Sequence, residues 1–166
     1  MLTVLTPLIE WLPGADHQNS FSPQDKQAMS CLAAGRTAKA IRLYKRTLVD
    51  CEQALGSSHP YTFRSRNNLA MGYRAAGRTA EAIPLLERTL ADCERVLRAG
   101  HPDTLTARNN LAMSYQAAGR TAEAIPLLER TLADYERMLG AGHPKTKAAR
   151  KNLAALTSEP ESQLGT

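Results

Sequence analysis

The sequence predicts an all-α protein, an α-solenoid of stacked helix-turn-helix hairpins with about three and a half repeats. The first observation is an internal period of 42 residues, marked by His17, His59, His101 and His143 and by Gly35, Gly77 and Gly119. Residues 56–97 and 98–139 are identical at 31 of 42 positions. The second observation is that apolar residues within a repeat follow helical spacing and do not alternate with period two, which excludes a β-propeller of similar repeat length.

The period divides the chain into an array over 14–157, with units 14–55, 56–97 and 98–139 and a half repeat over 140–157. Residues 1–13 are predicted to be an N-terminal capping segment that covers the exposed end with apolar side chains. The half repeat is predicted to be a first helix without its mate, kept soluble by Lys145, Lys147, Arg150 and Lys151. Residues 158–166 are predicted to be a disordered tail. Both ends of the chain look truncated, because residues 1–13 and 140–157 are each less than a complete repeat. This leaves open that the chain is a fragment of a longer protein or a degenerate gene product.

Each unit is predicted to contain two helices that meet at a glycine. In 98–139 the first helix has apolar or small residues at Leu105, Leu111, Ala112 and Tyr115. It stops at Gly119, which serves as a C-terminal cap. Thr121 is predicted to be the N-cap of the second helix. The apolar stripe of that helix consists of Ala124, Leu128, Thr131, Leu132, Tyr135 and Leu139.

Two prolines break a local rule of helix formation. Pro84 and Pro126 lie roughly one and a half turns into their helices, where proline removes a backbone hydrogen bond and crowds the carbonyl four residues back. We expect a slight bend there, or a partly irregular first turn. Arg42 has the matching place in the first unit, so that helix is predicted to begin more regularly. In the same unit Cys31 stands where the other units have tyrosine, so its first helix is predicted to pack less well.

These motifs resemble the tetratricopeptide repeat. Leu111-Ala112-x2-Tyr115 followed by Ala124-x3-Leu128 matches the core of that repeat, and the preceding unit matches again. The period of 42, His-Pro between units, Asn-Asn-Leu-Ala in the first helix and Ala-x-Pro-Leu in the second resemble the kinesin-light-chain variety. The chain shows no heptad segment like the one with which kinesin light chain holds its motor partner. Because the composition is rich in alanine, arginine and leucine and poor in phenylalanine, we expect a bacterial source.

The resemblance implies a right-handed solenoid whose first helices line a concave groove that holds an extended peptide. The positions that match this groove are Arg64, Asn67, Asn68, Met71, Arg74, Thr106, Asn109, Asn110, Met113, Gln116, Lys151 and Asn152. Asparagine amides can pair with any peptide backbone, methionine gives adaptable apolar contact, and the basic residues favour an acidic partner or a free carboxylate. The first unit offers Asp25, Lys26 and Met29 instead. The alternative role for these asparagines is to tie one hairpin to the next.

The histidines and cysteines are interpreted as structural. Equivalent histidines of stacked hairpins lie about 8–10 Å apart, too far to share a zinc ion whose ligands are about 2 Å away. We expect each to hydrogen-bond the start of a helix, with the following proline setting the first turn. Cys51 and Cys93 occupy matching sites and are predicted to be small buried hydrophobes rather than a disulfide. No metal or cofactor is expected.

The sequence also argues against catalysis. It contains no phosphate-binding loop, no zinc-protease helix motif and no nucleophile-elbow motif. Acidic residues of the second helices interleave with arginines, which is typical of a solvated helix face; these are Glu81, Glu87, Asp92 and Glu94 with Arg78, Arg88 and Arg95. We therefore predict a non-enzymatic protein-interaction scaffold.

Charge and composition define the remaining alternatives. The formal net charge of +5 is spread over the units as +2, +2 and 0, without an aromatic platform, so a regulatory or nucleic-acid-associated module is the second reading. Self-association through the unpaired final helix is a third. The sequence contains no apolar run of the about 20 residues that a membrane span needs. Three cysteines without a C-x-x-C pair fit a reducing, cytoplasmic setting.

Overall fold

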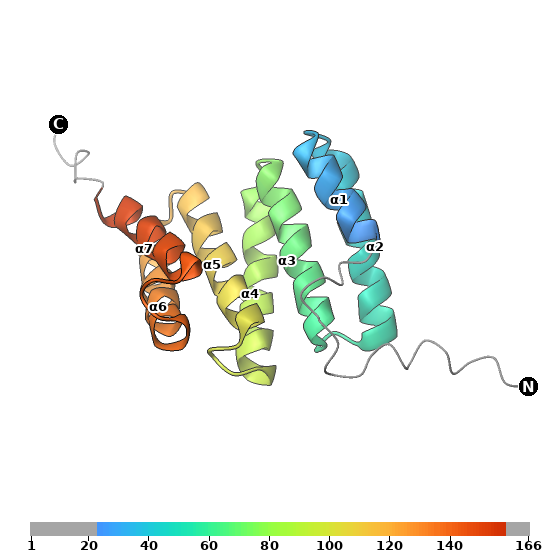
Figure 1. The fold of residues 1–166 in the computed structure, drawn as a ribbon. Coiled ribbons are helices and arrows are strands. Elements are labelled where there is room, and N and C mark those ends of the chain that lie inside the picture. Colours follow the sequence, from blue (N-terminus) through green and yellow to red (C-terminus); the bar gives the residue numbers. More distant parts are fainter. Residues whose placement is uncertain (1–22, 159–166) are drawn as a thin grey trace, which may run out of the picture.

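The structure, a computed structural model, describes residues 23–158. This part of the chain forms seven helices and no strand: α1 (Pro23–Ala33), α2 (Thr37–Leu55), α3 (Pro60–Ala75), α4 (Thr79–Val96), α5 (Pro102–Ala117), α6 (Thr121–Leu139) and α7 (Pro144–Thr157). Figure 1 shows hairpins side by side in one row that follows the order of the chain. The predicted all-α solenoid is thereby confirmed. The predicted capping segment, His17 and the tail after residue 158 lie outside the described residues.

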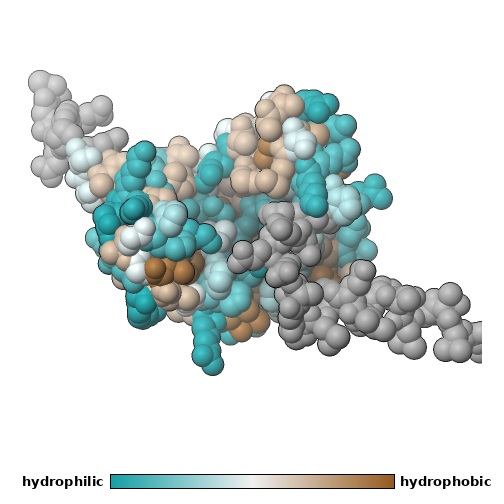
Figure 2. Space-filling view, in the orientation of Figure 1, coloured by the Kyte–Doolittle hydropathy of each residue, from teal (hydrophilic) through white to brown (hydrophobic). Residues whose placement is uncertain are grey.

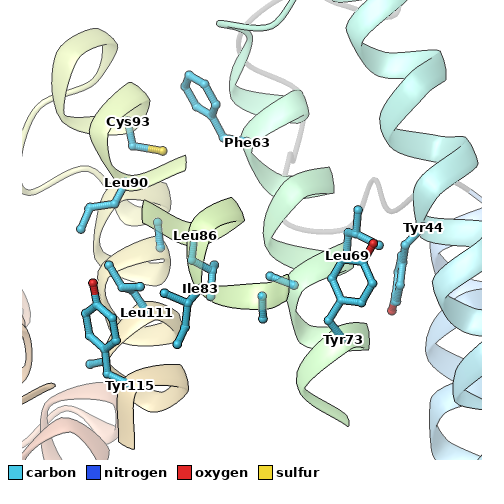
Figure 3. Close-up of a cluster of buried hydrophobic side chains, with 14 of the residues drawn as sticks. Tyr44, Phe63, Leu69, Tyr73, Ile83, Leu86, Leu90, Cys93, Leu111 and Tyr115 are labelled. Carbon is cyan, nitrogen blue, oxygen red and sulfur yellow. The ribbon is translucent and has the colours of Figure 1, made fainter. Parts of the chain in front are cut away.

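Packing between neighbouring helices builds the array. Each helix contacts the next along the chain, and α3 also contacts α1 and α5. The apolar stripes of the helices join into one buried cluster from α1 to α7, part of which is shown in Figure 3. Leu105, Tyr135 and Ala149 form a second, smaller cluster between α5, α6 and α7. Each fully buried leucine stabilises such a core by about 1.5–3 kcal/mol.

No helix within residues 23–158 is long and apolar enough to cross a membrane.

The turn inside each hairpin depends on glycine, as the sequence predicts. Gly77 and Gly119 have φ of +72° and +73°, a left-handed conformation that other residues rarely adopt. In the last hairpin the Gly119 amide donates to the Gln116 carbonyl at 2.9 Å, and the Arg120 amide donates to the Tyr115 carbonyl at 2.8 Å. This pair of bonds is the Schellman motif, which closes the end of α5.

The prediction that Thr121 is the N-cap of the second helix is wrong. Thr121 is the first helical residue of α6, and Arg120 is the N-cap, without a side-chain capping bond. The turn is so short that Arg120 serves both helices: its amide completes the end of α5, and its carbonyl accepts from the Ala124 amide at 3.2 Å. Residues 118–120 separate the two helices, and Arg120, directly before Thr121, holds the N-cap position.

The connection between hairpins is capped by histidine, which confirms the structural role predicted for these residues. The Nδ1 atoms of His59, His101 and His143 accept from the backbone amides two residues later, at 3.1, 3.1 and 3.2 Å. A proline follows each histidine at the start of the helix, where its missing N–H costs nothing. Burial lowers the pKa of His59, which favours the neutral ring that can accept this bond.

The second helices begin at equivalent residues, whether or not they contain a proline. Helices α4 and α6 start at Thr79 and Thr121, which are equivalent to Thr37 at the start of the proline-free α2. In the first turns of α4 and α6, the amides of Glu81 and Glu123 donate to the carbonyls three residues back, those of Arg78 and Arg120, at 3.1 and 3.2 Å. The first turn of α2 has only the ordinary bond from the Ala40 amide to the Arg36 carbonyl. The first turns of the proline-containing helices are thus partly of the 3-10 type, and the first unit begins more regularly, as predicted. Pro84 and Pro126 are exposed and lie close to the helix start. Each therefore costs only one hydrogen bond, which the packed stripe of the helix offsets.

The cysteines are free thiols inside the array, as predicted. Cys31, Cys51 and Cys93 are all buried and unbridged. Burial raises the pKa of the Cys93 thiol to about 12, so it stays protonated at neutral pH. The Sγ atom of Cys51 lies 3.4 Å from the Ser65 hydroxyl. These residues therefore act as small core side chains.

Packing explains why one repeat has glycine at position 72 and the next has serine at the equivalent position 114. A Cβ atom added to Gly72 would lie 3.2 Å from Tyr44 Cδ2 and 3.3 Å from Ile41 Cγ1. The next repeat has Ser114 and the smaller Leu86 at the positions equivalent to Gly72 and Tyr44. Figure 3 shows Tyr44 reaching from α2 towards α3. The glycine thus accommodates the larger tyrosine in the junction between the first two hairpins.

This pairing predicts that the two positions are coupled. Gly72→Ser should lower the free energy of unfolding by about 1–2 kcal/mol, because the added atoms overpack the Tyr44 site. In a Tyr44→Leu background the same change should cost at least about 0.5 kcal/mol less. Urea denaturation of the wild type, both single variants and the double variant measures this coupling. Strictly additive effects would show that the serine does not meet the tyrosine.

Candidate functional site

The twelve residues predicted for the peptide groove lie on α3, α5 and α7. Asn67 is buried, Thr106 and Lys151 are exposed, and the other nine are half-buried. Half-burial is what residues on an open face between packed helices should show. Of the alternatives from the first unit, Asp25 is buried, whereas Lys26 and Met29 are exposed. Figure 2 shows a mainly hydrophilic surface in which hydrophobic residues form small separate groups.

Side-chain contacts bridge the first helices in two of the three junctions between hairpins. Between α1 and α3, the Tyr61 hydroxyl donates to Asp25 Oδ2 at 3.5 Å. Between α3 and α5, Arg64 Nε donates to Asp103 Oδ1 at 2.9 Å. The Asp103 side chain is only 9% exposed. These contacts occupy polar groups that would otherwise face a ligand.

The α3–α5 junction also contains an asparagine pair. Asn110 Nδ2 donates to Asn67 Oδ1 at 3.4 Å, and Asn67 is only 5% exposed. The alternative role for asparagine, tying one hairpin to the next, therefore describes Asn67 and Asn110. Asn68, next to Asn67, remains half-buried on the same helix.

The third junction, between α5 and α7, is open. A depression of about 160 Å³, which we call the α5–α7 slot, is lined by Thr106, Asn109, Tyr135, Lys145, Ala148, Ala149 and Asn152. Three of these residues, Thr106, Asn109 and Asn152, belong to the predicted groove. Asn109 and Asn152 are the repeat equivalents of Asn67 and Asn110, yet their side chains form no hydrogen bond within residues 23–158. Two amides are thus available to a ligand at this place.

The sequence patterns did not predict that two arginines are buried. Arg66 and Arg108 are 1% and 0% exposed. Each bridges two second helices: Arg66 contacts Glu52 at 3.0 Å and Asp92 at 2.8 Å, and Arg108 contacts Glu94 and Asp134 in the same way. The sequence contains a signal for this arrangement, because the arginine and both acidic positions recur at the 42-residue period. The arginines are Arg66, Arg108 and Arg150, the glutamates are Glu52, Glu94 and Glu136, and the aspartates are Asp50, Asp92 and Asp134.

Some acidic residues of the second helices therefore bind buried arginines instead of lying on a solvated helix face. Glu81 pairs with Arg78 on the exposed surface, as predicted. In contrast, Asp92 binds the buried Arg66, and Glu94 binds the buried Arg108, so the prediction of a solvated face is wrong for these two. Hydrogen bonding from Arg95 and Arg66 lowers the pKa of Asp92 despite its partial burial. The network links the second helices of neighbouring hairpins.

Glu87 has a different partner, a tyrosine. The Tyr115 hydroxyl donates to Glu87 Oε1 at 2.6 Å. Burial and this hydrogen bond raise the pKa of Tyr115 to about 12. The Arg120 guanidinium lies over the same ring, 4.3 Å from its centre. This cluster fixes the turn between α5 and α6.

Within residues 23–158, no three histidine, cysteine, aspartate or glutamate side chains gather in a way that could hold a metal ion.

Comparison with known proteins agrees with this architecture. The tetratricopeptide repeat family model matches residues 19–95, 65–137 and 103–161. Comparison with curated proteins gives no match. Among solved structures, the chain is similar to a Podospora anserina protein described as a kinesin light chain with nearly identical TPR-like repeats. The TM-score is 0.77, with 33% identity over 80% of this chain and 63% of that one.

A second similarity concerns the fold alone. BtubC (BKLC) from P. vanneervenii gives a TM-score of 0.69 at 24% identity, over 78% of this chain and 51% of that chain. The present chain therefore spans less than two thirds of the length of either protein. It belongs to the tetratricopeptide repeat family, and its structural neighbours are kinesin-light-chain-like repeat proteins.

Proposed function

We propose that this protein is a non-enzymatic interaction scaffold that binds an extended peptide segment of a partner protein along α3, α5 and α7. Tetratricopeptide repeats generally mediate protein–protein interactions, and their fold is typically non-catalytic. The observation that carries the proposal is the α5–α7 slot, where Asn109 and Asn152 lie beside a depression with their amides unpaired in the described part of the chain. An asparagine amide offers both a donor and an acceptor, as the backbone of an extended peptide requires.

The rest of the face supports a peptide rather than a small ligand. Asn68, Met71, Arg74 and Met113 are half-buried along α3 and α5. Methionine contacts adapt to different side chains, and Arg74 keeps its charge although burial lowers its pKa. Polar and adaptable apolar groups thus follow one another along neighbouring helices. Such a surface suits a chain of several residues.

Selection from a random peptide library tests the proposal. Peptides selected on the wild-type protein should bind the Asn109→Ala/Asn152→Ala double variant about tenfold or more weakly, because two amide contacts are lost. This pair is preferable to one that includes Asn110, whose side chain already bonds Asn67. Isothermal titration calorimetry gives the dissociation constants, and circular dichroism confirms that the variant is folded.

A control variant separates a loss at the slot from a general effect. Gln53→Ala removes an exposed amide on α2, away from α3, α5 and α7, and should leave binding unchanged. If the selected peptides bind the double variant as tightly as the wild type, their site is not this face. If selection yields no peptide that binds, the scaffold proposal fails.

A further inference from the structure

The exposed face of α2 differs in charge from the same face of α4 and α6. Five exposed basic residues lie on its N-cap and first three turns with no acidic residue among them, and we call this set the α2 basic face: Arg36, Lys39, Arg42, Lys45 and Arg46. The equivalent residues are Arg78, Glu81, Pro84, Glu87 and Arg88 in α4 and Arg120, Glu123, Pro126, Glu129 and Arg130 in α6. In each later helix the positive and negative charges of this face therefore cancel.

The charges of the later helices also find partners nearby, whereas those of α2 do not. In α4 and α6 the first arginine of the face pairs with the first glutamate. Glu87 accepts a hydrogen bond from the Tyr115 hydroxyl at 2.6 Å. Lys45 stands in the place of Glu87, and its Nζ atom lies 5.7 Å from the centre of the Tyr73 ring. None of the five cations of the α2 basic face forms an ion pair within residues 23–158.

This arrangement is unfavourable for α2 on its own. The first turn of α2 contains no acidic residue, whereas α4 and α6 have Glu81 and Glu123 in theirs. The N-terminus of a helix carries partial positive charge, so a cation such as Lys39 destabilises it. Arg42 lies three residues after Lys39 and four before Arg46, at spacings where like charges on a helix repel each other. Residues that break local rules without a compensating contact are typical of a functional surface.

The α2 basic face lies opposite the packing surface of its helix. Helix α2 packs against α1 and α3 through its buried stripe. Helical spacing places Lys39, Arg42 and Arg46 in one row on the other side, away from the first helices that carry the predicted groove. Val49 continues this row and is 50% exposed, whereas the later helices have alanine there. The row thus combines three cations with one apolar side chain.

We infer that the α2 basic face binds an acidic helix of a partner protein, at a second interaction surface separate from the face of α3, α5 and α7. A partner helix lying along α2 has the same rise of about 1.5 Å per residue. Carboxylates three and four positions apart therefore meet Lys39, Arg42 and Arg46, and an apolar residue one turn further on contacts Val49. The inference goes beyond the proposed function and does not depend on it.

Two observations favour a protein over a nucleic acid. The exposed Val49 gains from apolar contact, which a phosphate backbone does not offer. Single-stranded nucleic acid binds by stacking its bases on accessible aromatic rings. Tyr73, the ring beside Lys45, is only 8% exposed, and the Arg78 guanidinium lies 4.8 Å from its centre. The ring is therefore not free to stack with a base.

Nuclear magnetic resonance titration with two synthetic peptides tests this surface. Both are acetylated and amidated alanine-based helices of about 18 residues. The first has three glutamates at spacings of three and four residues and a leucine three residues further on, and the second has glutamines instead. The glutamate peptide should shift the backbone amide signals of residues 36–49. It should bind at least about tenfold more tightly, because each exposed ion pair contributes about two- to fivefold, and this difference should shrink at high salt.

Two double variants with the same change of charge locate the effect. Lys39→Glu/Lys45→Glu gives α2 the acidic residues that α4 and α6 have at these positions. It should abolish the preference for the glutamate peptide, while its midpoint of urea denaturation should be no lower than that of the wild type. Arg98→Glu/Lys147→Glu changes exposed residues outside α2 and should keep the preference.

The inference is overturned if the two peptides bind equally, if the α2 variant keeps the preference, or if the shifted signals lie outside α2. Tighter binding of duplex DNA or of phosphatidylglycerol vesicles to the same residues would also overturn it, by assigning the face to a nucleic acid or to a lipid surface. Peptides selected from the random library should bind the α2 variant as they bind the wild type. Failure of this inference would therefore leave the proposed function standing.

Discussion

Replacing Arg108 by methionine will lower the free energy of unfolding by about 3 kcal/mol. The Arg108 side chain is 0% exposed, and it joins Glu94 of α4 to Asp134 of α6 through contacts of 3.2 and 2.7 Å. Methionine fills a similar space but leaves both carboxylates without their central cation. Removing one partner of a buried ion pair costs about 3–5 kcal/mol. We expect the low end because Arg137 and Arg130 still contact the two acids.

The repeat provides a matched control for this change. Arg150 is the equivalent residue of α7 and binds Glu136 as Arg108 binds Glu94, but its side chain is 48% exposed. An exposed pair contributes about 0–1 kcal/mol, so Arg150→Met should cost less than about 1 kcal/mol. Urea denaturation followed by circular dichroism compares the two variants. Equal losses of unfolding free energy in the two variants would contradict the conclusion that the large effect at Arg108 arises from its burial rather than from the pairing alone.

Replacing Phe63 by alanine will have a comparable or larger effect, about 3–5 kcal/mol. The Phe63 side chain is fully buried in the main core cluster, and Figure 3 shows it on α3, in the gap between that helix and α4. Truncation removes most of its apolar contacts and leaves a cavity that the packed helices cannot fill. The loss should appear as a lower midpoint of urea denaturation.

The next repeat again supplies the comparison. Leu105 is equivalent to Phe63 and is 2% exposed, so leucine is a residue that this position accepts. Phe63→Leu should therefore cost less than about 1.5 kcal/mol, because most of the volume is kept. An alanine variant no less stable than the leucine variant would mean that the aromatic ring does not pack as the structure indicates.

Much of the fold could be predicted because the signals are local and repeated. A glycine with positive φ closes α1, α3 and α5, and a His-Pro pair opens α3, α5 and α7, through hydrogen bonds that span only two to five residues. Such bonds depend little on the rest of the molecule. Thr121 shows the limit, since its role as N-cap fails once one residue of the turn serves both helices.

The candidate site could be predicted only in outline. Asn67 and Asn109 have the same neighbours in sequence, but the first is buried in an asparagine pair and the second lines an open slot. The difference arises from the residues across the junction, Asp103 in one case and Lys145 in the other, and from how closely the helices approach. These contacts join residues 39 or 43 positions apart. No local pattern reveals them.

By itself, the sequence determined the hairpin, its 42-residue period and the helices that carry the polar face. Those features follow from apolar spacing and from capping bonds within a few residues. Only the tertiary structure decided which junctions are bridged, and that Arg66 and Arg108 are buried between second helices. The physical reason is that burial and the pairing of charges depend on what the neighbouring hairpin presents, and identical residues meet different partners along the array.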